Sequence, residues 1–568
     1  MTPKEALNKY FGYDDFRPLQ SEIIASVLSG RDTLALMPTG GGKSICFQVP
    51  ALVMGNENPD KRLCLVITPL IALMRDQVAN LQARGIHAEA VYTGMSFDKQ
   101  RIALDNCLYG PYHFLYCSPE RLESEEFRKR LKDLPIGLIA VDEAHCISQW
   151  GYDFRPSYLN IAAVRELLPQ VPVLALTATA TPTVVEDIQR RLGFQETNVL
   201  KMSFRRENLQ YIVRRTDNKP EQIAHILSKV PGSAIVYVRN RKRAQELSEW
   251  LKEQGESADY YHAGLTTRER NERQEAWKEG QTRVIVATNA FGMGIDKADV
   301  RLVLHHDLPS HLESYYQEAG RAGRDGQTSY AVLLYNEEDK SKARKRVIDT
   351  YPPKEFVEQV YHKTMDFLQI GAGSGLGHRF ALHMDQLCHV MHLPVIQTYS
   401  ALHLLTQAGY IDFQEEYETQ PRVCIRVQRA QLGEYDLSST QIALLDHLMR
   451  HYSGIFTDLQ YVREADKPED HETLVSLAQR GIITYIPRSV GCCLTMTKER
   501  EAEIYLSPLI YDDRQKRFAE QLHAMVEYAE QTQFCREQVL LAYFGETSAV
   551  PCGHCDVCRE IARRIIAE

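Results

Sequence analysis

Short apolar runs, separated by longer segments with the spacing of amphipathic helices, dominate the first part of the chain. Within residues 1–205 the strand-like runs read TLALM, LCLVIT, FLYCS, LIAVD and VLALTAT. Runs of this length, rich in β-branched residues, are typical of strands buried in a parallel sheet. Residues 206–337 repeat the pattern with AIVYV, VIVAT, LVLHHDL and AVLLY. The sequence therefore predicts two α/β lobes, each with a parallel sheet.

The pattern becomes mainly helical after these lobes. Residues 338–350 predict a basic helix, and residues 351–430 read as a helix-turn-helix followed by a hairpin over IDFQEEYETQPRVCIRV. Residues 431–508 repeat this order, with a hairpin over ITYIPRSVGCCLTMT. Helices followed by a hairpin predict two winged-helix-like units, with a helical packing or dimerisation domain as the alternative. Residues 509–568 begin with a charged helix and end in a cysteine cluster.

Composition and charge change this picture little. Hydrophobic residues make up 44% and charged residues 25% of the sequence, as in soluble domains. The N-terminal MTPKEALNKYFGY lacks an apolar signal core, and no apolar run approaches the roughly 18 residues that span a bilayer. We expect a cytoplasmic protein (nucleoid-associated if bacterial) with no membrane partner, and take a monomer as the working oligomeric state. The net charge of -9 argues only weakly against nucleic acid, since binding needs a basic stripe rather than a basic whole.

A glycine-rich segment, MPTGGGKS, directly follows the strand-like run TLAL. Its glycines let successive backbone N–H groups turn toward a polyphosphate. Lys43 supplies a charge near the β- and γ-phosphates, and Ser44 can ligate Mg²⁺. The strict motif has glycine where this chain has Met37, which weakens the match but leaves the glycine cradle intact. The residues expected to bind nucleotide here are Thr39, Gly40, Gly41, Gly42, Lys43 and Ser44.

Two further motifs fit the same chemistry. LIAVDEAH places Asp142 and Glu143 at the end of an apolar strand, where the phosphate loop of such a sheet lies nearby. Asp142 can hold the water shell of Mg²⁺, and Glu143 can orient and deprotonate the attacking water. In YYQEAGRAGRDG, Arg321 and Arg324 share one helical face and suit an arginine finger from the second lobe. The sequence therefore predicts ATP hydrolysis that requires the lobes to close.

Three strand-like runs end in Ser-Pro or Thr-Pro, at Thr68-Pro69, Ser118-Pro119 and Thr181-Pro182. This pairing predicts a helix N-cap followed by the first helical residue. Helix N-termini aligned at one sheet edge can also follow a nucleic acid backbone. Thr68 and Ser118 are therefore candidate DNA contacts, with helix capping alone as the alternative.

Eight motifs taken together resemble the RecQ DNA helicases. They are FGYDDFRPLQ, MPTGGGKS, VITPLIALMRDQ, YCSPERL, VDEAHCISQWGYDFRPSY, LALTATAT, ATNAFGMGIDKADVR and YYQEAGRAGRDG. The resemblance covers residues 1 to about 337. It implies RecA-like lobes of superfamily 2 that use ATP and Mg²⁺ to translocate 3′→5′ on single-stranded DNA. It also implies unwinding of duplex DNA in recombination, repair and replication.

The resemblance also implies roles for single residues. Tyr13, Arg17 and Gln20 are expected to read adenine, Gln20 through paired amide hydrogen bonds. Gln317 is expected to join the two arginines in sensing the γ-phosphate. The residues implied to link the nucleotide to DNA in the second lobe are Asn289 and Asp296.

An aromatic stretch, CISQWGYDFRPSY, follows Glu143 closely and holds one of the chain's 3 tryptophans. In RecQ-like enzymes this stretch is a loop that meets single-stranded DNA. Bases can stack on Trp150 or Phe154, and Arg155 can contact a phosphate or a base face, without sequence choice. The alternative is a core of aromatic residues under the sheet, which Gly151 and Pro156 disfavour.

Four of the 13 cysteines form a tail cluster with the spacing C-x16-C-x2-C-x2-C. Four thiolates suit a closed tetrahedral Zn²⁺ site without a catalytic position, and the segment is similar to the RecQ zinc segment. A disulfide is disfavoured in a reducing compartment, and an iron–sulfur cluster is a second alternative. The expected ligands are Cys535, Cys552, Cys555 and Cys558.

The order of segments departs from the usual RecQ order, in which the zinc subdomain directly follows the motor. Here the cysteines come after both winged-helix-like units, so we expect residues 351–508 to be inserted within the zinc subdomain. The hairpin that separates strands is then one of two candidates, the turn at 416–421 or the turn at 488–491. Two other functions remain open, a superfamily-2 translocase or RNA remodeller and a DNA-binding protein without enzymatic activity.

Overall fold

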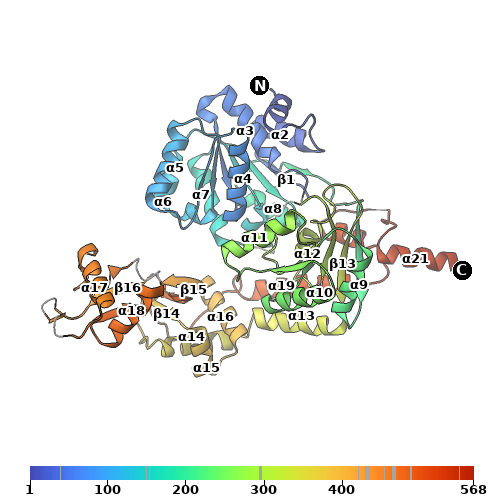
Figure 1. The fold of residues 1–568 in the computed structure, drawn as a ribbon. Coiled ribbons are helices and arrows are strands. Elements are labelled where there is room, and N and C mark those ends of the chain that lie inside the picture. The colour runs from blue at the N-terminus through green and yellow to red at the C-terminus, as the bar shows by residue number, and fades with distance from the viewer. Residues whose placement is uncertain are drawn as a thin grey trace. The chain divides into compact units, whose positions relative to one another are not determined.

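The computed structural model divides into two compact units, and Figure 1 draws the fold as a ribbon. The first unit is formed by residues 1–343 together with 518–568, and the second by residues 344–517. The second unit is thus inserted into the first along the chain. The structure describes all residues except 39, 149, 152, 153, 293–296, 420, 429, 430, 433, 434, 453, 459, 463–467, 487, 488, 549 and 568.

The first lobe is built on a seven-stranded parallel sheet in the order β3-β4-β2-β5-β6-β1-β7. Alternate residues of a strand enter different cores: Leu63 and Leu65 pack on one face, Cys64 and Val66 on the other. The strands are β1 (Thr33–Leu36), β2 (Leu63–Ile67), β3 (Ala88–Val91), β4 (Phe114–Cys117), β5 (Ile136–Val141), β6 (Val173–Thr177) and β7 (Val199–Lys201). The helices are α1 (Pro3–Ala6), α2 (Gln20–Leu28), α3 (Ile45–Glu57), α4 (Ile71–Ala83), α5 (Phe97–Tyr109), α6 (Glu125–Leu131), α7 (Ile161–Leu167) and α8 (Pro182–Arg191).

The second lobe repeats this architecture with a six-stranded parallel sheet in the order β10-β11-β9-β12-β13-β8. The strands are β8 (Leu209–Arg215), β9 (Ser233–Tyr237), β10 (Ala258–Tyr261), β11 (Val284–Ala287), β12 (Val300–His305) and β13 (Ser329–Tyr335). The helices are α9 (Lys219–Lys229), α10 (Arg241–Glu253), α11 (Thr267–Lys278) and α12 (Leu312–Ala319). The prediction of two α/β lobes with parallel sheets is confirmed.

The inserted unit contains two small antiparallel sheets, in the orders β14-β19-β15 and β17-β16-β18. The outer part comprises α14 (Lys354–Phe367), β14 (Arg379–Leu382), α15 (Met384–Val390), α16 (Val395–Gln407), β15 (Ile411–Thr419) and β19 (Ser489–Met496). Between β15 and β19 the chain forms β16 (Arg422–Ile425), α17 (Ser439–His451), β17 (Gln460–Tyr461), α18 (Pro468–Gln479) and β18 (Ile483–Ile486). Each part has its own hydrophobic core, so one helix-and-sheet unit is nested within the other.

This nesting shows that both hairpins expected from the sequence are wrong. β15 pairs with β19, with Ile411 opposite Met496, and β16 pairs with β18, with Arg422 opposite Ile486. The two halves of each supposed hairpin therefore lie in different sheets. The alternation of apolar and polar residues along a strand does not depend on which strand it pairs with. The Gln-Pro sequence after β15 also has the composition of a turn, which favoured a hairpin. The two turns proposed to separate DNA strands, 416–421 and 488–491, are described only in part, because residues 420 and 488 lie outside the described residues.

The last segment of the chain returns to the second lobe. It comprises α19 (Asp512–Glu530), α20 (Arg536–Tyr543) and α21 (Asp556–Ala567), and it meets the start of α13 (Glu337–Thr350). Glu530 accepts hydrogen bonds from Lys340 (2.9 Å) and from the Tyr335 hydroxyl (2.8 Å). This packing fits the expectation that a zinc subdomain is interrupted by the inserted unit. The residue bounds of that subdomain remain a prediction. Among the described helices, none is both long and apolar enough to cross a membrane.

Candidate nucleotide and nucleic-acid site

The phosphate loop joins the end of β1 to the start of α3. Gly40 and Gly42 adopt left-handed φ values of 83° and 79°, which only glycine adopts without strain. A Cβ atom at Gly42 would lie 2.4 Å from the Gln20 Nε2 atom, so the close approach also needs glycine. Ser44 precedes the helix without capping it through its side chain, which leaves that hydroxyl to other partners. Thr39, also expected in this loop, lies outside the described residues.

The three residues expected to read adenine lie next to this loop. Gln20 is buried, and its Nε2 donates to the Gly42 carbonyl at 3.0 Å while its Oε1 accepts from the Arg17 backbone N–H at 2.9 Å. Arg17 also donates to the Gly40 carbonyl at 2.5 Å, and Tyr13 is 50% exposed. Gln20 and Arg17 thus hold the loop in this structure, and adenine reading remains a prediction.

The two acids meet the loop lysine at the end of β5. Lys43 Nζ lies 3.9 Å from Glu143 Oε1, and His145 Nδ1 lies 3.4 Å from Glu143 Oε2. Burial, followed by the nearby Glu143, raises the pKa of the Asp142 carboxyl to about 6. A bound cation would relieve this unfavourable burial of charge, and carboxylate and hydroxyl oxygens are the donors that Mg²⁺ prefers. Asp142 and Ser44 therefore fit a magnesium site.

The two arginines of YYQEAGRAGRDG occupy different positions. Arg321 is buried and donates to the carbonyl of Gly292 within the second lobe. The Arg324 side chain instead lies against the phosphate loop of the first lobe, since a Cβ on Gly40 would be 3.1 Å from its Cγ. Of the two, Arg324 is therefore the one beside the phosphate loop, and its role as an arginine finger remains a prediction.

The aromatic stretch folds back onto the turn η4 (Ala144–Ile147) that follows the acids. The Arg155 backbone N–H donates to the Cys146 carbonyl at 2.9 Å. Tyr158 is fully buried and its hydroxyl donates to the Asp142 carbonyl at 3.0 Å, whereas Trp150 is 44% exposed. The loop therefore divides between core and surface, with Phe154 half-buried. Gln149, Tyr152 and Asp153 lie outside the described residues.

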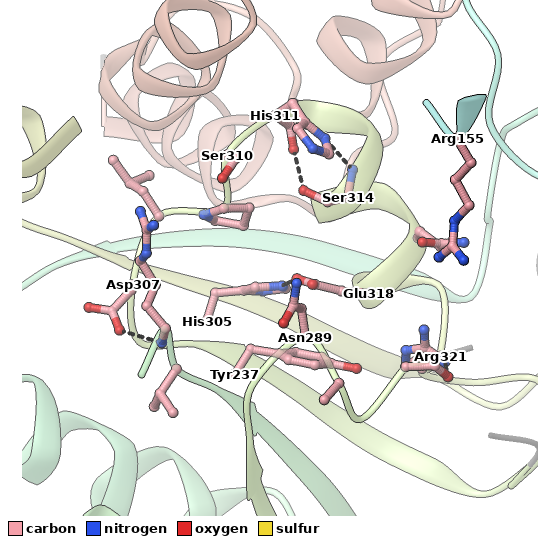
Figure 2. A pocket seen from close by; sticks show the side chains of 17 residues that line it. Arg155, Tyr237, Asn289, His305, Asp307, Ser310, His311, Ser314, Glu318 and Arg321 are labelled. Carbon is pink, nitrogen blue, oxygen red and sulfur yellow. Dashed lines mark hydrogen bonds and ion pairs between the residues drawn. The ribbon is translucent and has the colours of Figure 1, made fainter. Parts of the chain in front are cut away.

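A cavity of about 460 Å³ opens where this loop meets the second lobe. Figure 2 shows Arg155 reaching toward it from the first lobe, with Asn289 and Arg321 on the second. Gln317 also lines it, and Asp296 lies outside the described residues. Arginine, amide and hydroxyl groups around an open cavity suit an anionic ligand.

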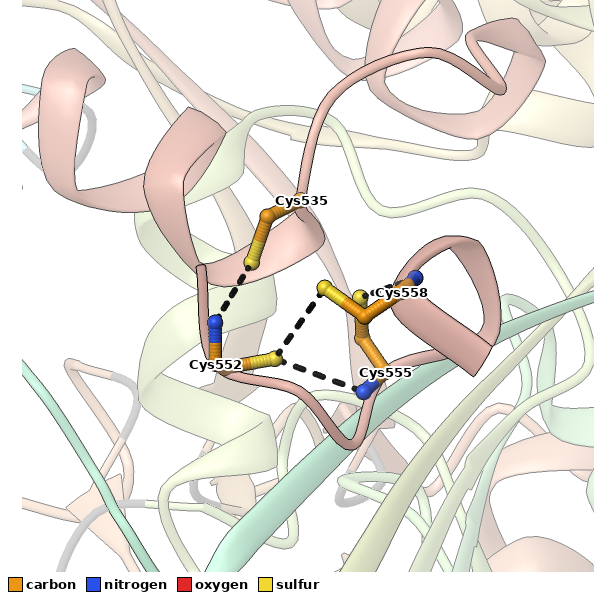
Figure 3. Close-up of side chains that lie close together, drawn as sticks. All are labelled: Cys535, Cys552, Cys555 and Cys558. Carbon is orange, nitrogen blue, oxygen red and sulfur yellow. Dashed lines mark hydrogen bonds between the residues drawn. The ribbon is translucent and has the colours of Figure 1, made fainter. Parts of the chain in front are cut away.

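The four tail cysteines converge as expected. Their Sγ atoms all lie within 4.8 Å of one another, and Figure 3 shows them facing a common centre. A tetrahedron of Zn–S bonds of about 2.3 Å has edges of roughly 3.8 Å, close to the 4.0 Å between the sulfurs of Cys552 and Cys558. Backbone N–H groups donate to three of these sulfurs at 3.3 Å, which favours thiolates. The cluster therefore fits a structural zinc ion.

Comparison with known proteins bears on all of these sites. A model described as DEAD/DEAH box helicase matches residues 17–188, the Helicase conserved C-terminal domain matches 218–326, and RecQ zinc-binding matches 500–559. The ATP-dependent DNA helicase RecQ of Pasteurella multocida is 42% identical over 339 residues, 60% of this chain and 53% of that protein. The helicase of the same name from Bacillus subtilis is 46% identical over 336 residues, 59% of this chain and 56% of that protein.

In its helicase domains and its zinc-binding segment, this chain is similar to the RecQ helicases. It spans little more than half the length of these two curated relatives. Among solved structures, the DNA-bound helicase MrfA has a TM-score of 0.51 at 20% identity, covering 59% of this chain and 51% of that one. At this identity the likeness is one of fold alone.

One of the three predicted helix caps is wrong, because the N-cap of α4 is Leu70 rather than Thr68. The other two are confirmed in position: Ser118 precedes the short helix η3 (Pro119–Glu123) and Thr181 precedes α8, each followed by proline in the first turn. Neither hydroxyl caps its helix through a side-chain hydrogen bond, since proline at the first helical position already has a helical φ. Thr68 and Ser118 are 1% exposed, and their contact with DNA remains a prediction.

Two histidines near these sites were not predicted from the sequence as functional residues. His145 bridges Glu143 to the Thr177 hydroxyl, which lies 2.9 Å from its Nδ1. His305 stacks on Tyr237 at 5.3 Å and lies 2.8 Å from Glu318 at the cavity. The sequence signal for His145 was its place within DEAH. The signal for His305 was the pair of histidines, His305 and His306, at the end of an apolar strand.

Proposed function

We propose that this chain is an ATP-dependent DNA helicase that translocates 3′→5′ on single-stranded DNA and unwinds duplex DNA in recombination and repair. One observation carries the proposal: Lys43 lies 3.9 Å from Glu143, and the Arg324 side chain from the second lobe lies against Gly40 of the same phosphate loop. A finger from the second lobe makes hydrolysis depend on lobe closure, which is how chemistry is converted into motion.

Hydrolysis follows from groups of this chain. Glu143 accepts a proton from the water that attacks the γ-phosphorus, and the bond to the β–γ bridging oxygen breaks. Lys43 and Arg324 balance the negative charge on the phosphate oxygens. Asp142 and Ser44 would hold Mg²⁺, which supplies further charge neutralisation when bound.

The loop that follows the acids supports coupling to DNA. Trp150 presents a ring to solvent for base stacking, and Arg155 lies beside the cavity with Asn289. Because Tyr158 of the same loop is hydrogen-bonded to the Asp142 carbonyl, ordering the loop on DNA would be transmitted to the acids.

A strand-displacement experiment tests the proposal directly. A duplex with a 3′ single-stranded tail should be unwound in the presence of ATP and Mg²⁺, and one with a 5′ tail should not. Glu143→Gln provides the matched inactive control. Equal unwinding from a 5′ tail would contradict the polarity, and no unwinding with DNA-stimulated ATPase intact would favour a translocase.

The two other functions have their own signatures. An RNA remodeller would separate RNA duplexes better than DNA duplexes under the same conditions. A DNA-binding protein without enzymatic activity would show no ATP turnover, which the placement of Lys43, Glu143 and Arg324 disfavours.

A further inference from the structure

The turn that ends α20, residues 543–546, makes contacts that its place beside the cysteine cluster does not explain. Here it is called the α20 turn, and the segment 202–208 between β7 and β8 is called the interlobe linker. The α20 turn contacts this linker, helix α12 of the second lobe and the start of α8 in the first lobe, all within the first compact unit.

The contacts with the linker are polar and aromatic. Glu546 accepts hydrogen bonds from the Phe204 backbone N–H at 3.0 Å and from the Ser203 hydroxyl. The ring of Phe544 lies 4.7 Å from that of Phe204. The backbone carbonyl of Phe544 accepts a hydrogen bond from Lys201 Nζ at 3.2 Å. One carboxylate and one ring thus hold consecutive residues of the linker, the segment whose dihedral angles must change when the lobes move.

The contacts with α12 reach the helix that precedes the arginines. The Tyr543 hydroxyl donates to the buried carboxyl of Glu313 at 2.8 Å. The Phe544 ring lies 5.1 Å from that of Tyr316, whose hydroxyl donates to the Phe204 carbonyl at 2.7 Å. The chain passes from α12 to Arg321 and then Arg324, so a shift of this helix moves the finger.

The contact with the first lobe requires glycine. Gly545 has a φ of 69°, and a Cβ there would lie 2.6 Å from Cγ of Pro182, the first residue of α8. Further along α8, Asp187 accepts a hydrogen bond from Ser148 at 2.8 Å, at the base of the aromatic loop. The α20 turn is therefore packed against an element tied to the loop expected to meet DNA.

We propose that the α20 turn is a positioning element that couples the cysteine-cluster subdomain to ATP hydrolysis by holding the interlobe linker and α12 in register. It touches neither nucleotide nor reacting atoms. The inference rests on the proposed function, because it needs a motor whose lobes close. Glu546 and Phe544 carry it, since each contacts the linker and Phe544 also contacts α12.

The test is steady-state ATPase of the full chain, with and without single-stranded DNA. Glu546→Ala should lower the DNA-stimulated kcat about tenfold, the effect of losing roughly 1.4 kcal/mol of transition-state stabilisation. KM for ATP, the affinity for single-stranded DNA and zinc content should stay within twofold. Glu520→Ala, the same change at an exposed position of α19, is the matched control and should behave as wild type.

A double-mutant cycle separates positioning from general destabilisation. Ser203→Ala should lower kcat alone but add nothing to Glu546→Ala, because the hydroxyl and the carboxylate share one hydrogen bond. Gly545→Ala should lower kcat as well, since it pushes against Pro182. If Glu546→Ala does not fold, Glu546→Gln, which keeps the side-chain length, carries the same test.

The outcomes distinguish this inference from the proposed function. An active wild type with unchanged kcat in folded, zinc-loaded Glu546 variants would overturn the coupling and leave the helicase assignment intact. Additive losses in the cycle would also overturn it. A wild type without ATP turnover would overturn both.

Discussion

Glu143 combines a buried carboxylate with an unusual backbone conformation. It adopts a φ of 48°, in the left-handed region that costs a non-glycine residue roughly 1–2 kcal/mol. In this conformation its carboxylate lies between Lys43 and His145. Backbone strain held by such surroundings is typical of a residue placed for chemistry rather than for packing.

Replacing Glu143 by Gln should lower kcat for ATP by about 10²–10⁴-fold, because the amide cannot accept the proton of the attacking water. ATP and DNA binding should persist, since the side chain keeps its shape. Lys43→Ala should also abolish turnover, through loss of charge at the phosphates. Steady-state ATPase and nucleotide-binding assays measure both, with exposed Glu186→Gln of α8 as the control. Normal hydrolysis by either variant would refute the assignment of the nucleotide site.

The aromatic loop offers a matched pair of changes. Trp150→Ala should abolish most of the stimulation of ATPase by single-stranded DNA with a smaller loss of thermal stability than a change of a fully buried ring, because Trp150 is 44% exposed. Tyr158→Phe should instead lower the free energy of unfolding by about 1 kcal/mol, since it removes the hydrogen bond to the Asp142 carbonyl. Denaturant melts and ATPase titrations with DNA separate the two. Stimulation that survives in Trp150→Ala, with stability lost, would favour a packing role.

At the scale of elements, the strands recognised from apolar runs are the interior strands of both sheets. The four edge strands, β3, β7, β8 and β10, escaped recognition. Interior strands are buried along almost their whole length, whereas β3 and β10 are only half-buried at their central residues. A strand with one unpaired edge keeps polar side chains, so it lacks the continuous apolar run that marks a buried parallel strand.

The independence of the two cores of the inserted unit can be tested by removing the inner part, the segment between β15 and β19. Thr419 at the end of β15 lies opposite Ser489 at the start of β19, so replacing residues 420–488 with Asn-Gly should close a two-residue hairpin. The outer sheet and core should then survive, because the two cores contain different residues. Circular dichroism and thermal melting of the full chain with this deletion measure the result, with the motor's ATPase as an internal standard. Aggregation of the shortened chain would show that the two cores fold only together.

For the whole molecule, the cysteine cluster lies in residues 518–568, which pack with residues 1–343 to form the first compact unit. Arg536, beside Cys535, is buried and forms an ion pair with Asp556 at 3.0 Å. The cluster thus holds α20 and α21 together while α20 reaches the linker between the lobes. A metal at this position would stabilise contacts between segments separated by the whole inserted unit.

Elemental analysis should find about one zinc per chain and no visible absorbance, because four thiolates leave no open position. Cys552→Ser and Cys555→Ser should lose the metal, with solubility and DNA binding falling before the nucleotide site is affected. Cys388→Ser, outside the cluster, is the control and should retain zinc. A visible absorption band would favour an iron–sulfur cluster, and a metal-free, fully active protein would end the assignment.

The sequence by itself determined the interior strands, the glycine loop with Lys43, the acids after β5 and the cysteine spacing. Each of these is a local pattern whose chemistry depends on neighbouring residues. Only the tertiary structure decided that Arg324 rather than Arg321 reaches the phosphate loop, that β15 pairs with β19, and that the α20 turn holds the interlobe linker. These outcomes depend on which distant segments pack together, and that choice is made by the free energy of the whole fold rather than by any local run of residues.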